Sequence, residues 1–334
     1  MPEKKRWEKR PVAGVDLGAT KILAGVVSAD GEILGAAKRA TKAQVGPETV
    51  VERIAKTVRE AAEIAGIAPS DLAAIGAGAP GPLDPDHGIV LRTPNMPGWD
   101  NLPLAQLLSE QLGAPAFLGN DVDLGTLGEY ALGAGQGCQH VVGIFVGTGI
   151  GGGLVLNGQL WQGWRRAAAE IGHMIVLADG PYCGCGNRGC LEAVASRTAI
   201  ERDIRAGIKA GRESVLPELM KLDSKNRLTS GALVEALNQG DTLVAEILSR
   251  AQYYLGLGVA TAVNFLDPEM VILGGGVVEA LGEPFLEPIR RTAYQHFINK
   301  RNAWDVKIVP ARLGDNAALL GAAVYARWRL TDTR

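Results

Sequence analysis

Residues 141–156 read VVGIFVGTGIGGGLVL, and residues 12–27 read VAGVDLGATKILAGVV. Each stretch places an apolar strand, a turn that contains Gly and Thr, and a second apolar strand in that order. This pattern predicts two β-hairpins whose turns expose backbone N–H groups, and such groups hold phosphate oxygens. The repeat indicates two related halves of the chain, each able to grip a phosphate.

The pattern around these hairpins mixes strands and helices. Apolar runs predict further strands at residues 33–40, 72–77, 116–119, 270–273 and 306–309. Apolar stripes at helical spacing predict helices at residues 47–65, 122–132 and 316–330 and in most of 199–256. The sequence therefore predicts an α/β protein.

Two phosphate-binding hairpins in two domains resemble the actin-like ATPase fold, which is also called ribonuclease H-like and holds nucleotide in an interdomain cleft. This resemblance implies a smaller N-terminal α/β domain at residues 11–119, onto which a helix at 317–334 packs back. The larger α/β domain would occupy residues 120–316 and carry the zinc site and the catalytic Asp that are described below.

The composition excludes several classes of protein. With 334 residues, 47% of them hydrophobic, the chain is long enough for two domains with substantial cores. A formal net charge of −2 favours neither nucleic acid nor an acidic membrane as a partner. The basic start lacks the apolar segment of a secretory signal, and the longest apolar run, residues 141–156, is too short and Gly-rich to span a bilayer. Four cysteines, three of them close together, fit a reducing cytoplasm.

A Cys-rich stretch predicts a metal site. His173 precedes Cys183, Cys185 and Cys190, so one imidazole and three thiolates are available, which is the ligand set of a tetrahedral zinc site. Four protein ligands leave no open position, so we expect the zinc to be structural. The alternative is a loop with free or disulfide-bonded cysteines, but the adjacent sulfurs of a C-x-C pair form strained disulfides.

Two acidic residues flank these ligands. Glu170 lies three residues before His173, and Glu192 lies two residues after Cys190. Because the metal would fix its ligands, it would also fix the two carboxylates relative to each other. We therefore expect the zinc ion to position the carboxylates of Glu170 and Glu192 and not to take part in the reaction.

Polar residues also gather in the turn of the first hairpin. Asp16, Gly18 and Thr20 form this turn, and Lys21 follows it. Backbone N–H groups and the Thr20 hydroxyl can grip phosphate oxygens while the carboxylate of Asp16 faces a metal ion. The D-x-G-x-T pattern alone is a weak signal, because many tight hairpins contain it.

Asn120 and Asp121 follow the predicted strand at residues 116–119. Active groups of open α/β sheets lie at this end of the strands, although an Asp here can simply cap the next helix. Earlier in the chain, a loop stiffened by prolines carries Asn95 and Trp99. We interpret Trp99 as a packing residue and Asn95 as a candidate for binding a hydroxyl group.

The Cys-rich stretch resembles the signature of the ROK family of sugar kinases and repressors, G-H-x(n)-C-x-C-G-x-x-G-C-x-E-x-x-x-S. The chain has Gly172 and His173, then Cys183, Cys185 and Gly186, then Gly189, Cys190, Glu192 and Ser196 in the matching places. The resemblance runs from the first strand to the last helix and implies an ATP-dependent hexokinase of the glucokinase type that phosphorylates the 6-hydroxyl of glucose.

The resemblance also implies roles for single residues. Asp121 would be the general base, and the sugar would be bound by Asn95, Asn120, Asp121, Glu170, His173 and Glu192. Mg²⁺ would bridge the ATP phosphates near Asp16, and Lys21 would lend charge. The phosphates would lie on Gly18 to Thr20 and on Gly147, Thr148 and Gly149, and the nucleoside on Gly274, Gly275 and Gly276. Relatives of this kind often form homodimers.

Several alternatives stay open at this point. N-acetylglucosamine, N-acetylmannosamine, mannose and fructose kinases share the same frame, and the phosphate donor could be polyphosphate instead of ATP. A repressor of the family carries a DNA-binding winged helix, whereas only about eleven residues precede the first predicted strand here. A sugar-binding protein without catalysis is a further alternative. Two positions depart from the family, Asp123 where many relatives have Asn and Ala318 where Gly is common.

Overall fold

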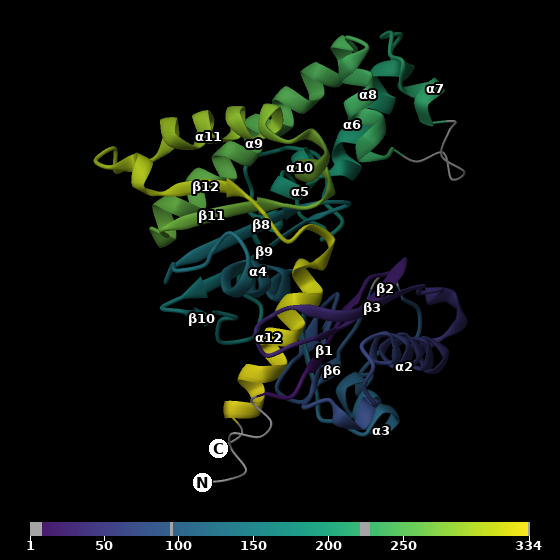
Figure 1. Cartoon of the computed structure of the whole chain (residues 1–334). Helices are drawn as coiled ribbons and strands as arrows, with labels where there is room; N and C mark the ends of the chain where they lie inside the picture. The colour runs from purple at the N-terminus through teal and green to yellow at the C-terminus, as the bar shows by residue number, and fades with distance from the viewer. Residues whose placement is uncertain (1–8, 94–95, 221–227, 333–334) are drawn as a thin grey trace. The chain divides into compact units, whose positions relative to one another are not determined.

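The computed structural model of the chain describes residues 9–93, 96–220 and 228–332 (Figure 1). The chain divides into two compact units. The first contains Met1–Gly137, Gly153–Ala168 and Asp315–Arg334, and the second contains Cys138–Gly152 and Ala169–Gly314. In the described ranges, no helix combines the length and hydropathy needed to cross a membrane.

The first sheet has five strands in the order β3-β2-β1-β4-β7. β1 pairs antiparallel with β2, and β2 pairs antiparallel with β3, so the predicted hairpin and its third strand are confirmed. β1, β4 and β7 run parallel, which brings their carboxyl ends to one edge of the sheet. The bounds are β1 Val12–Leu17, β2 Lys21–Val27, β3 Ile33–Ala40, β4 Ile75–Ala79 and β7 Ala116–Asn120.

Helices pack on this sheet within the first unit. The apolar side chains of Ala13, Val15 and Leu17 on β1 belong to the same core as those of α2 and α3. The alternate residue Gly14 points instead at α12, because successive residues of a strand face opposite sides. Figure 1 shows α12, in yellow, lying along β1. The helices are α2 Pro47–Ile64, α3 Leu104–Leu112, α4 Asp121–Leu132 and α12 Ala317–Asp332, and a small ribbon pairs β5 Leu83–Asp84 with β6 Ile89–Val90.

A row of glycines explains how closely α12 approaches the sheet. Gly25, Gly14 and Gly76 are register partners on β2, β1 and β4. A Cβ atom on Gly14 would lie 2.0 Å from the carbonyl oxygen of Leu319, and one on Gly76 would lie 1.9 Å from that of Ala322. The helix therefore rests on bare backbone.

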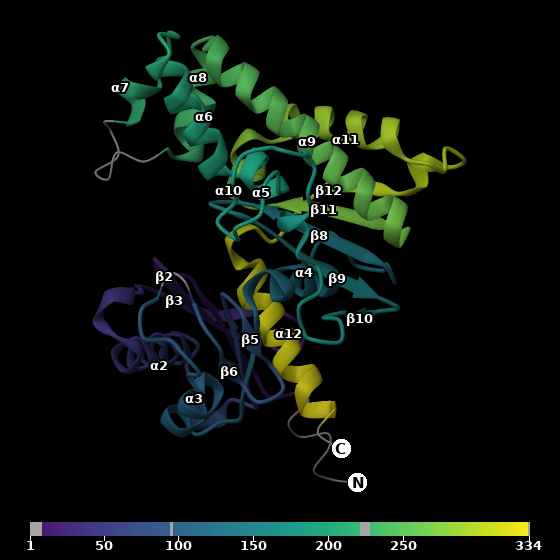
Figure 2. The ribbon, with the colours of Figure 1, turned by 180° about the vertical axis from the view of Figure 1, so that it is seen from behind.

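The second sheet has the order β10-β9-β8-β11-β12, in which β11 runs parallel to β8 and β12. Figure 2 shows α9 and α11 side by side, and they pack on each other in the second unit. The strands are β8 Val141–Val146, β9 Ile150–Leu156, β10 Gln159–Leu160, β11 Met270–Gly274 and β12 Lys307–Pro310. The helices are α5 Leu191–Ala195, α6 Arg197–Lys209, α7 Leu216–Met220, α8 Ser230–Asn238, α9 Thr242–Leu266, α10 Gly276–Leu281 and α11 Glu283–His296.

Two predicted boundaries were wrong, the start of one strand and the end of one turn. The strand predicted at residues 72–77 begins at Ile75, because a short 3-10 helix, Pro69–Asp71, precedes it. The Gly-rich turn predicted at residues 147–153 ends at Gly149, and Gly151, Gly152 and Gly153 belong to β9. Their lack of side chains admits close neighbours, since a Cβ atom on Gly153 would lie 2.3 Å from the Thr126 hydroxyl.

The boundary between the two units does not coincide with the boundary predicted between residues 119 and 120. The first unit includes α4, which begins with Asp121, and also residues 153–168. The reason is packing, because Leu124 and Leu127 of α4 share a buried cluster with Ala322 and Tyr325 of α12. The residue expected to be the general base therefore belongs to the first unit, and the Cys-rich site belongs to the second.

Candidate active site

Asp16 and Asp121 meet at the carboxyl edge of the first sheet. Asp16 lies near the end of β1, and its register partner on β4 is Gly78. Asp121 follows β7 as the first residue of α4, and its Cα lies 3.4 Å from the position of a Cβ on Gly78. Because Gly78 has no side chain, Asp121 can approach the strand next to Asp16, and the charge of Asp121 acts on the Asp16 carboxyl group.

Burial raises the pKa of both carboxyl groups, and the proximity of Asp121 adds to this effect at Asp16. Burial and, next, the charge of Asp121 raise the pKa of Asp16 to about 6, while Lys21 acts in the opposite direction. Burial raises the pKa of Asp121, and backbone N–H groups partly oppose this. Desolvation penalises the ionised form of both groups, and a like charge adds to the penalty at Asp16, so the pair is suited to receive a proton or a cation.

The turn after Asp16 is fixed by the backbone. The Gly18 N–H donates to the carbonyl oxygen of Lys21 over 2.9 Å, and the Thr41 hydroxyl donates to that of Gly18 over 2.6 Å. The side chain of Thr20 is exposed at the turn. The ammonium group of Lys21 lies 2.8 Å from the carboxylate of Asp315, so in this structure Lys21 has an acidic partner within the protein.

Asn120 takes the capping role that was considered for Asp121. Its side-chain oxygen accepts hydrogen bonds from the backbone N–H groups of Val122 and Asp123, at 2.9 and 3.2 Å. This satisfies two donors at the start of α4. Asp121 is therefore not needed as the cap, although its own carboxylate accepts from the Val122 N–H at 3.0 Å.

The four predicted metal ligands lie together in the second unit. One ligand atom from each of His173, Cys183, Cys185 and Cys190 lies within 4.8 Å of those of the others. The sulfur of Cys183 is 3.6 Å from Nδ1 of His173, and the sulfurs of Cys185 and Cys190 are 3.7 Å apart. All four cysteines are free of disulfides, so the disulfide alternative was wrong.

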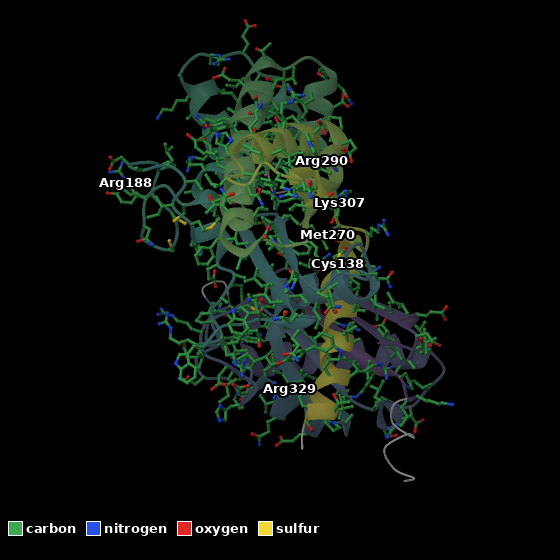
Figure 3. The ribbon with its side chains drawn as sticks, turned by 90° about the vertical axis from the view of Figure 1, so that its left-hand side faces the viewer. Cys138, Arg188, Met270, Arg290, Lys307 and Arg329 are labelled. Carbon is green, nitrogen blue, oxygen red and sulfur yellow. The ribbon has the colours of Figure 1, made fainter. Side chains whose placement is uncertain are left out.

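The loop between these ligands is held by its own backbone. Gly189 has a φ of 74°, and a Cβ atom there would lie 1.7 Å from the carbonyl oxygen of Leu177. Arg188 donates to the carbonyl oxygens of Gly180 and Asp179 at 3.0 and 2.7 Å. Figure 3 shows the loop that carries Arg188, with yellow sulfur atoms close to it.

These distances fit a tetrahedral zinc ion. With Zn–S bonds of about 2.3 Å and Zn–N bonds of about 2.0 Å, tetrahedral geometry places two sulfurs roughly 3.8 Å apart and a sulfur and a nitrogen roughly 3.5 Å apart. Burial, together with hydrogen bonds and charges from the neighbouring cysteines, raises the pKa of Cys190 to about 12. A cation would offset that cost, because metal binding displaces thiol protons.

Both flanking acids lie next to the cluster. The carboxylate of Glu170 is 3.9 Å from Nε2 of His173, which is the ring nitrogen not directed at Cys183. The carboxylate of Glu192 accepts from the Ile150 N–H at 2.9 Å. A Cβ atom on Gly149 would lie 2.3 Å from the same Glu192 oxygen, and the sulfur of Cys183 lies 3.7 Å from the other oxygen, so this carboxylate lies between the Gly turn and the group of Cys and His residues.

The turn at Gly147, Thr148 and Gly149 has a cationic neighbour that the sequence analysis missed. The guanidinium group of Arg197 donates to the Thr148 hydroxyl at 2.7 Å, and the Arg197 N–H donates to the carbonyl oxygen of Gly147 at 3.0 Å. Arg197 directly follows Ser196, the last residue of the family signature. Its position in the sequence was therefore a usable signal for a positive charge beside the turn that is predicted to bind phosphate.

The third Gly cluster joins β11 to α10 as predicted. Gly275 has a φ of 88°, and a Cβ atom there would lie 2.6 Å from the carbonyl oxygen of Val146. The buried hydroxyl of Ser230 lies 3.8 Å from the Cβ position of Gly276 and has no hydrogen-bond partner among the described residues. A bound molecule at this turn could supply one.

The proline-rich loop is only partly described. Asn95, a predicted sugar ligand, lies outside the described residues. Trp99 is 1% exposed in the core of the first unit, so its interpretation as a packing residue is confirmed.

Comparisons with known proteins place the chain among sugar kinases and related regulators. The ROK family pattern matches residues 12–329. A glucokinase of Thermotoga maritima is 39% identical over 322 residues, which cover 96% of this chain and 99% of the relative. A putative xylose repressor of Caldicellulosiruptor is 30% identical over 311 residues, which cover 93% of this chain and 76% of the relative.

A solved structure agrees with these sequence matches. The ROK family glucokinase of Streptomyces griseus, crystallised with glucose and AMPPNP, is 36% identical and superposes with a TM-score of 0.81, covering 95% of this chain and 99% of that one. The predicted α/β class and actin-like ATPase fold are thereby confirmed. The chain belongs to the ROK family.

Proposed function

We propose that this protein is an ATP-dependent sugar kinase that transfers the γ-phosphoryl group to the 6-hydroxyl of glucose. The observation that carries the proposal is the position of Asp121 at the carboxyl edge of the first sheet, with a pKa raised by burial. The similarity to a glucokinase over nearly the full chain supports the choice of reaction and sugar. A carboxylate of raised pKa is a better proton acceptor than an ordinary one at neutral pH.

In the proposed reaction, the carboxylate of Asp121 takes the proton of the sugar 6-hydroxyl. The sugar oxygen bonds to the γ-phosphorus of ATP, the bond from that phosphorus to the bridging oxygen breaks, and ADP leaves with the electron pair. This chemistry depends mainly on positioning and on neutralising phosphate charge. Asn95, Asn120, Glu170, His173 and Glu192 are assigned to the sugar hydroxyls.

The phosphates are assigned to two turns. The turns at Gly18 to Thr20 and at Gly147, Thr148 and Gly149 would hold phosphate oxygens, through donors other than the Gly18 and Gly147 N–H groups, which donate within their own turns. The guanidinium of Arg197 beside Thr148 adds positive charge. Lys21 would have to exchange its ion pair with Asp315 for a phosphate to contribute. The nucleoside is assigned to Gly274, Gly275 and Gly276, where the buried Ser230 hydroxyl is available.

Two metal ions belong to the proposal. Mg²⁺ supplied with ATP would neutralise phosphate charge, and Asp16 is assigned to it because its carboxylate is buried and experiences the negative charge of Asp121. Zn²⁺ on His173, Cys183, Cys185 and Cys190 would have a structural role. It would fix the imidazole of His173 and, through the loop, the carboxylate of Glu192.

The proposal also covers assembly and compartment. Phe265, Ile298 and Trp304 of the second unit are 86%, 85% and 71% exposed, and such large apolar side chains support a homodimer. Light scattering on the purified protein tests this, and a monomer at micromolar concentration would refute it. The four free thiols support a reducing compartment, the cytoplasm.

The decisive test is ADP release with Mg-ATP and a panel of hexoses, measured for the wild type and for Asp121→Asn. We expect glucose to be the preferred substrate and Asp121→Asn to lower kcat by roughly 10²–10⁴-fold, the usual contribution of a general base. Asp123→Asn is the matched control, because it removes a carboxylate two residues away and leaves an acceptor for the Gln162 amide. Equal turnover by wild type and Asp121→Asn would overturn the mechanism.

The same panel separates the remaining candidates. Faster turnover of N-acetylglucosamine, N-acetylmannosamine, mannose or fructose would replace glucose as the substrate, and polyphosphate can be compared with ATP in parallel. Sugar binding without any phosphoryl transfer would instead favour a sugar-binding regulator, the function suggested by the similarity to a repressor.

A further inference from the structure

A pocket with a volume of about 590 Å³ lies in the first unit, lined by residues 83–91, which include the ribbon of β5 and β6, and by residues 161–166. Small-molecule sites commonly enclose roughly 300–1,000 Å³, so the pocket is large enough for a metabolite. None of its lining residues has a role in the proposed kinase reaction. Those with chemical groups to offer are Asp84, Asp86, Trp161, Trp164, Arg165 and Arg166.

Two tryptophans give the pocket an aromatic surface that is open to solvent. Trp161 is 54% exposed and Trp164 is 98% exposed, and both line the pocket. Tryptophan is highly buried on average, so two exposed tryptophans beside one pocket are unusual. Exposed apolar groups that lie together in this way mark sites of interaction. The rings therefore favour a ligand whose surface is partly apolar.

The segment that carries both rings is fixed by its backbone. The Trp161 N–H donates to the carbonyl oxygen of Leu154 at 2.8 Å, and the Arg166 N–H donates to that of Gly163 at 3.3 Å. Gly163 and Arg166 have φ values of 74° and 55°, so both lie in the left-handed region that makes a tight turn. A backbone that is already ordered lowers the entropy cost of binding a ligand.

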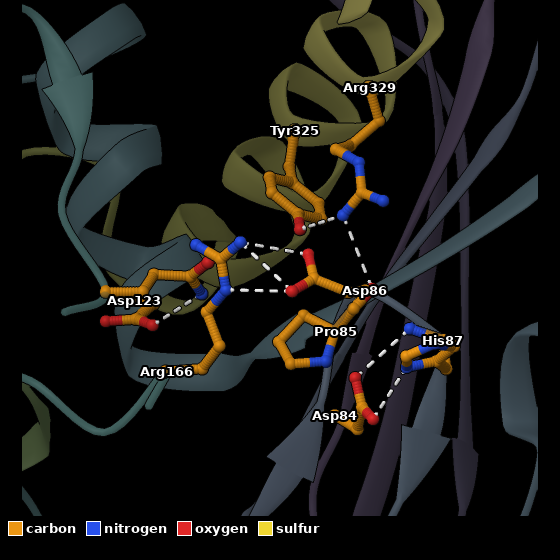
Figure 4. Close-up of polar contacts among 9 residues, drawn as sticks. Asp84, Pro85, Asp86, His87, Asp123, Arg166, Tyr325 and Arg329 are labelled. Atoms are coloured by element: carbon orange, nitrogen blue, oxygen red, sulfur yellow. Dashed lines mark hydrogen bonds and ion pairs between the residues drawn. The ribbon is translucent and has the colours of Figure 1, made fainter. Parts of the chain in front are cut away.

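Both carboxylates of the pocket are held in place. Figure 4 shows Nε and Nη2 of Arg166 donating to the two carboxylate oxygens of Asp86, at 3.1 and 3.0 Å. The His87 N–H donates to one oxygen of Asp84 at 3.1 Å, and Nδ1 of His87 lies 2.8 Å from the other. A carboxylate can accept about four hydrogen bonds, so these contacts leave each group able to accept from a hydroxyl.

The charges of the pocket favour a neutral ligand. The described lining residues include two carboxylates and two guanidinium groups, so their formal charges cancel. Because Arg166 is already paired with Asp86, an anion would have to compete with that carboxylate. A neutral molecule with hydroxyl groups avoids this competition, since a hydroxyl can donate to a carboxylate and accept from a guanidinium.

We propose that this pocket binds a neutral saccharide. The C–H groups on one face of a pyranose ring form an apolar surface that can pack on the face of an aromatic ring, whose π electrons attract their slight positive charge. Trp161 and Trp164 would contact this face, and Asp84, Asp86 and Arg165 would bind the hydroxyls at its edge. The proposal does not depend on the kinase function, because none of these residues is assigned to the reaction.

Titration of the full-length protein with maltose tests the proposal. Bound maltose should shield the exposed rings, so quenching of tryptophan fluorescence by acrylamide should decrease, and calorimetry gives the affinity of each variant. Trp161→Ala and Trp164→Ala should each weaken maltose binding roughly ten-fold or more, as expected for an aromatic contact residue. Asp84→Asn keeps an acceptor for the His87 N–H and should weaken binding by roughly three-fold, the effect of one hydrogen bond. Asp121→Asn should bind maltose like the wild type.

Trp304→Ala is the matched control, because Trp304 is an exposed tryptophan of the second unit that does not line the pocket. Trp164→Phe keeps an aromatic face and should bind more tightly than Trp164→Ala, which separates stacking from damage to the fold. Unchanged affinity in folded Trp161 and Trp164 variants would overturn the proposal. So would the absence of shielding by maltose, cellobiose and methyl α-glucoside.

Inorganic phosphate is a separate arm of the titration. If phosphate displaced maltose, the preference for a neutral ligand would be refuted. A wild type that binds maltose through the two tryptophans but phosphorylates no sugar would support this inference and refute the proposed kinase function, so the two failures can be told apart.

Discussion

Replacing Gly321 by Ala tests the packing that joins α4 to α12. The two helices cross at glycines, and a Cβ atom on Gly321 would lie 1.6 Å from the carbonyl oxygen of Leu124 and 2.8 Å from the nitrogen of Gly128. Ordinary contact begins at 3.4 Å. Both obstacles are backbone atoms, so no side-chain rotation can relieve the collision.

The helices would have to move apart, and α12 is also confined on the side of the sheet. There the positions of Gly14 and Gly76 bring strand backbone against α12. Overpacking in a core commonly costs about 1–3 kcal/mol and sometimes more, and we expect Gly321→Ala to reach about 3 kcal/mol. For a unit of this size each kcal/mol shifts the Tm by about 2–4 °C, so the expected decrease is roughly 6–12 °C.

Gly231→Ala is the control, because Gly231 is a helical glycine whose nearest neighbour to an added Cβ atom is 4.0 Å away. Alanine is the better helix former, so this change should stabilise the protein by about 0.5 kcal/mol. Differential scanning calorimetry and urea unfolding measure both variants. If Gly321→Ala melted at the wild-type temperature, the close contact of α4 with α12 would be refuted.

Two further predictions concern charge and metal. Because the pKa of Asp16 is raised from 3.8 to about 6, the folded protein holds a proton there that the unfolded chain releases, and stability falls as the pH rises through that window. In the absence of metal ions, the free energy of unfolding of Asp16→Asn, measured with urea, should therefore be about 2–3 kcal/mol larger than that of the wild type at pH 8, and the difference should disappear below pH 4. A difference that does not change with pH would contradict the raised pKa of Asp16. Elemental analysis should find one zinc ion per chain in the wild type and in the control Cys138→Ser, which lies outside the predicted ligand set. Cys185→Ser should contain no zinc and should have a lower Tm, because metal binding contributes to folding. Zinc retained by Cys185→Ser would contradict the ligand set.

Much of the local structure was predictable from neighbouring residues. The hairpin of β1 and β2 follows from two apolar runs around a Gly and Thr turn, and both strands and their antiparallel pairing are confirmed. The grouping of His173 with three cysteines was predictable for the same reason. These four residues, which are predicted to be metal ligands, lie within a stretch of eighteen residues, and Gly189 allows the loop to close tightly.

Strand boundaries were harder to predict where Gly is frequent. Gly151, Gly152 and Gly153 were assigned to a turn, because Gly is the residue that turns most often require. In the structure they belong to β9, where Gly153 is needed to admit the side chain of Thr126. The residue pattern around Gly153 does not indicate this contact, because Thr126 belongs to another element, α4.

The sequence by itself determined the elements whose causes are local: apolar periodicity, turn residues and the spacing of the Cys and His ligands. Only the tertiary structure decided that Asp16 and Asp121 lie near enough for the charge of Asp121 to act on Asp16, because the parallel register of β1, β4 and β7 brings both to the same edge of the sheet, on either side of Gly78. It likewise decided that α4 belongs with α12, since glycines on both helices let their backbones touch. Long-range contacts of this kind depend on shape complementarity between distant segments, and this complementarity cannot be predicted from the residue pattern of either segment alone.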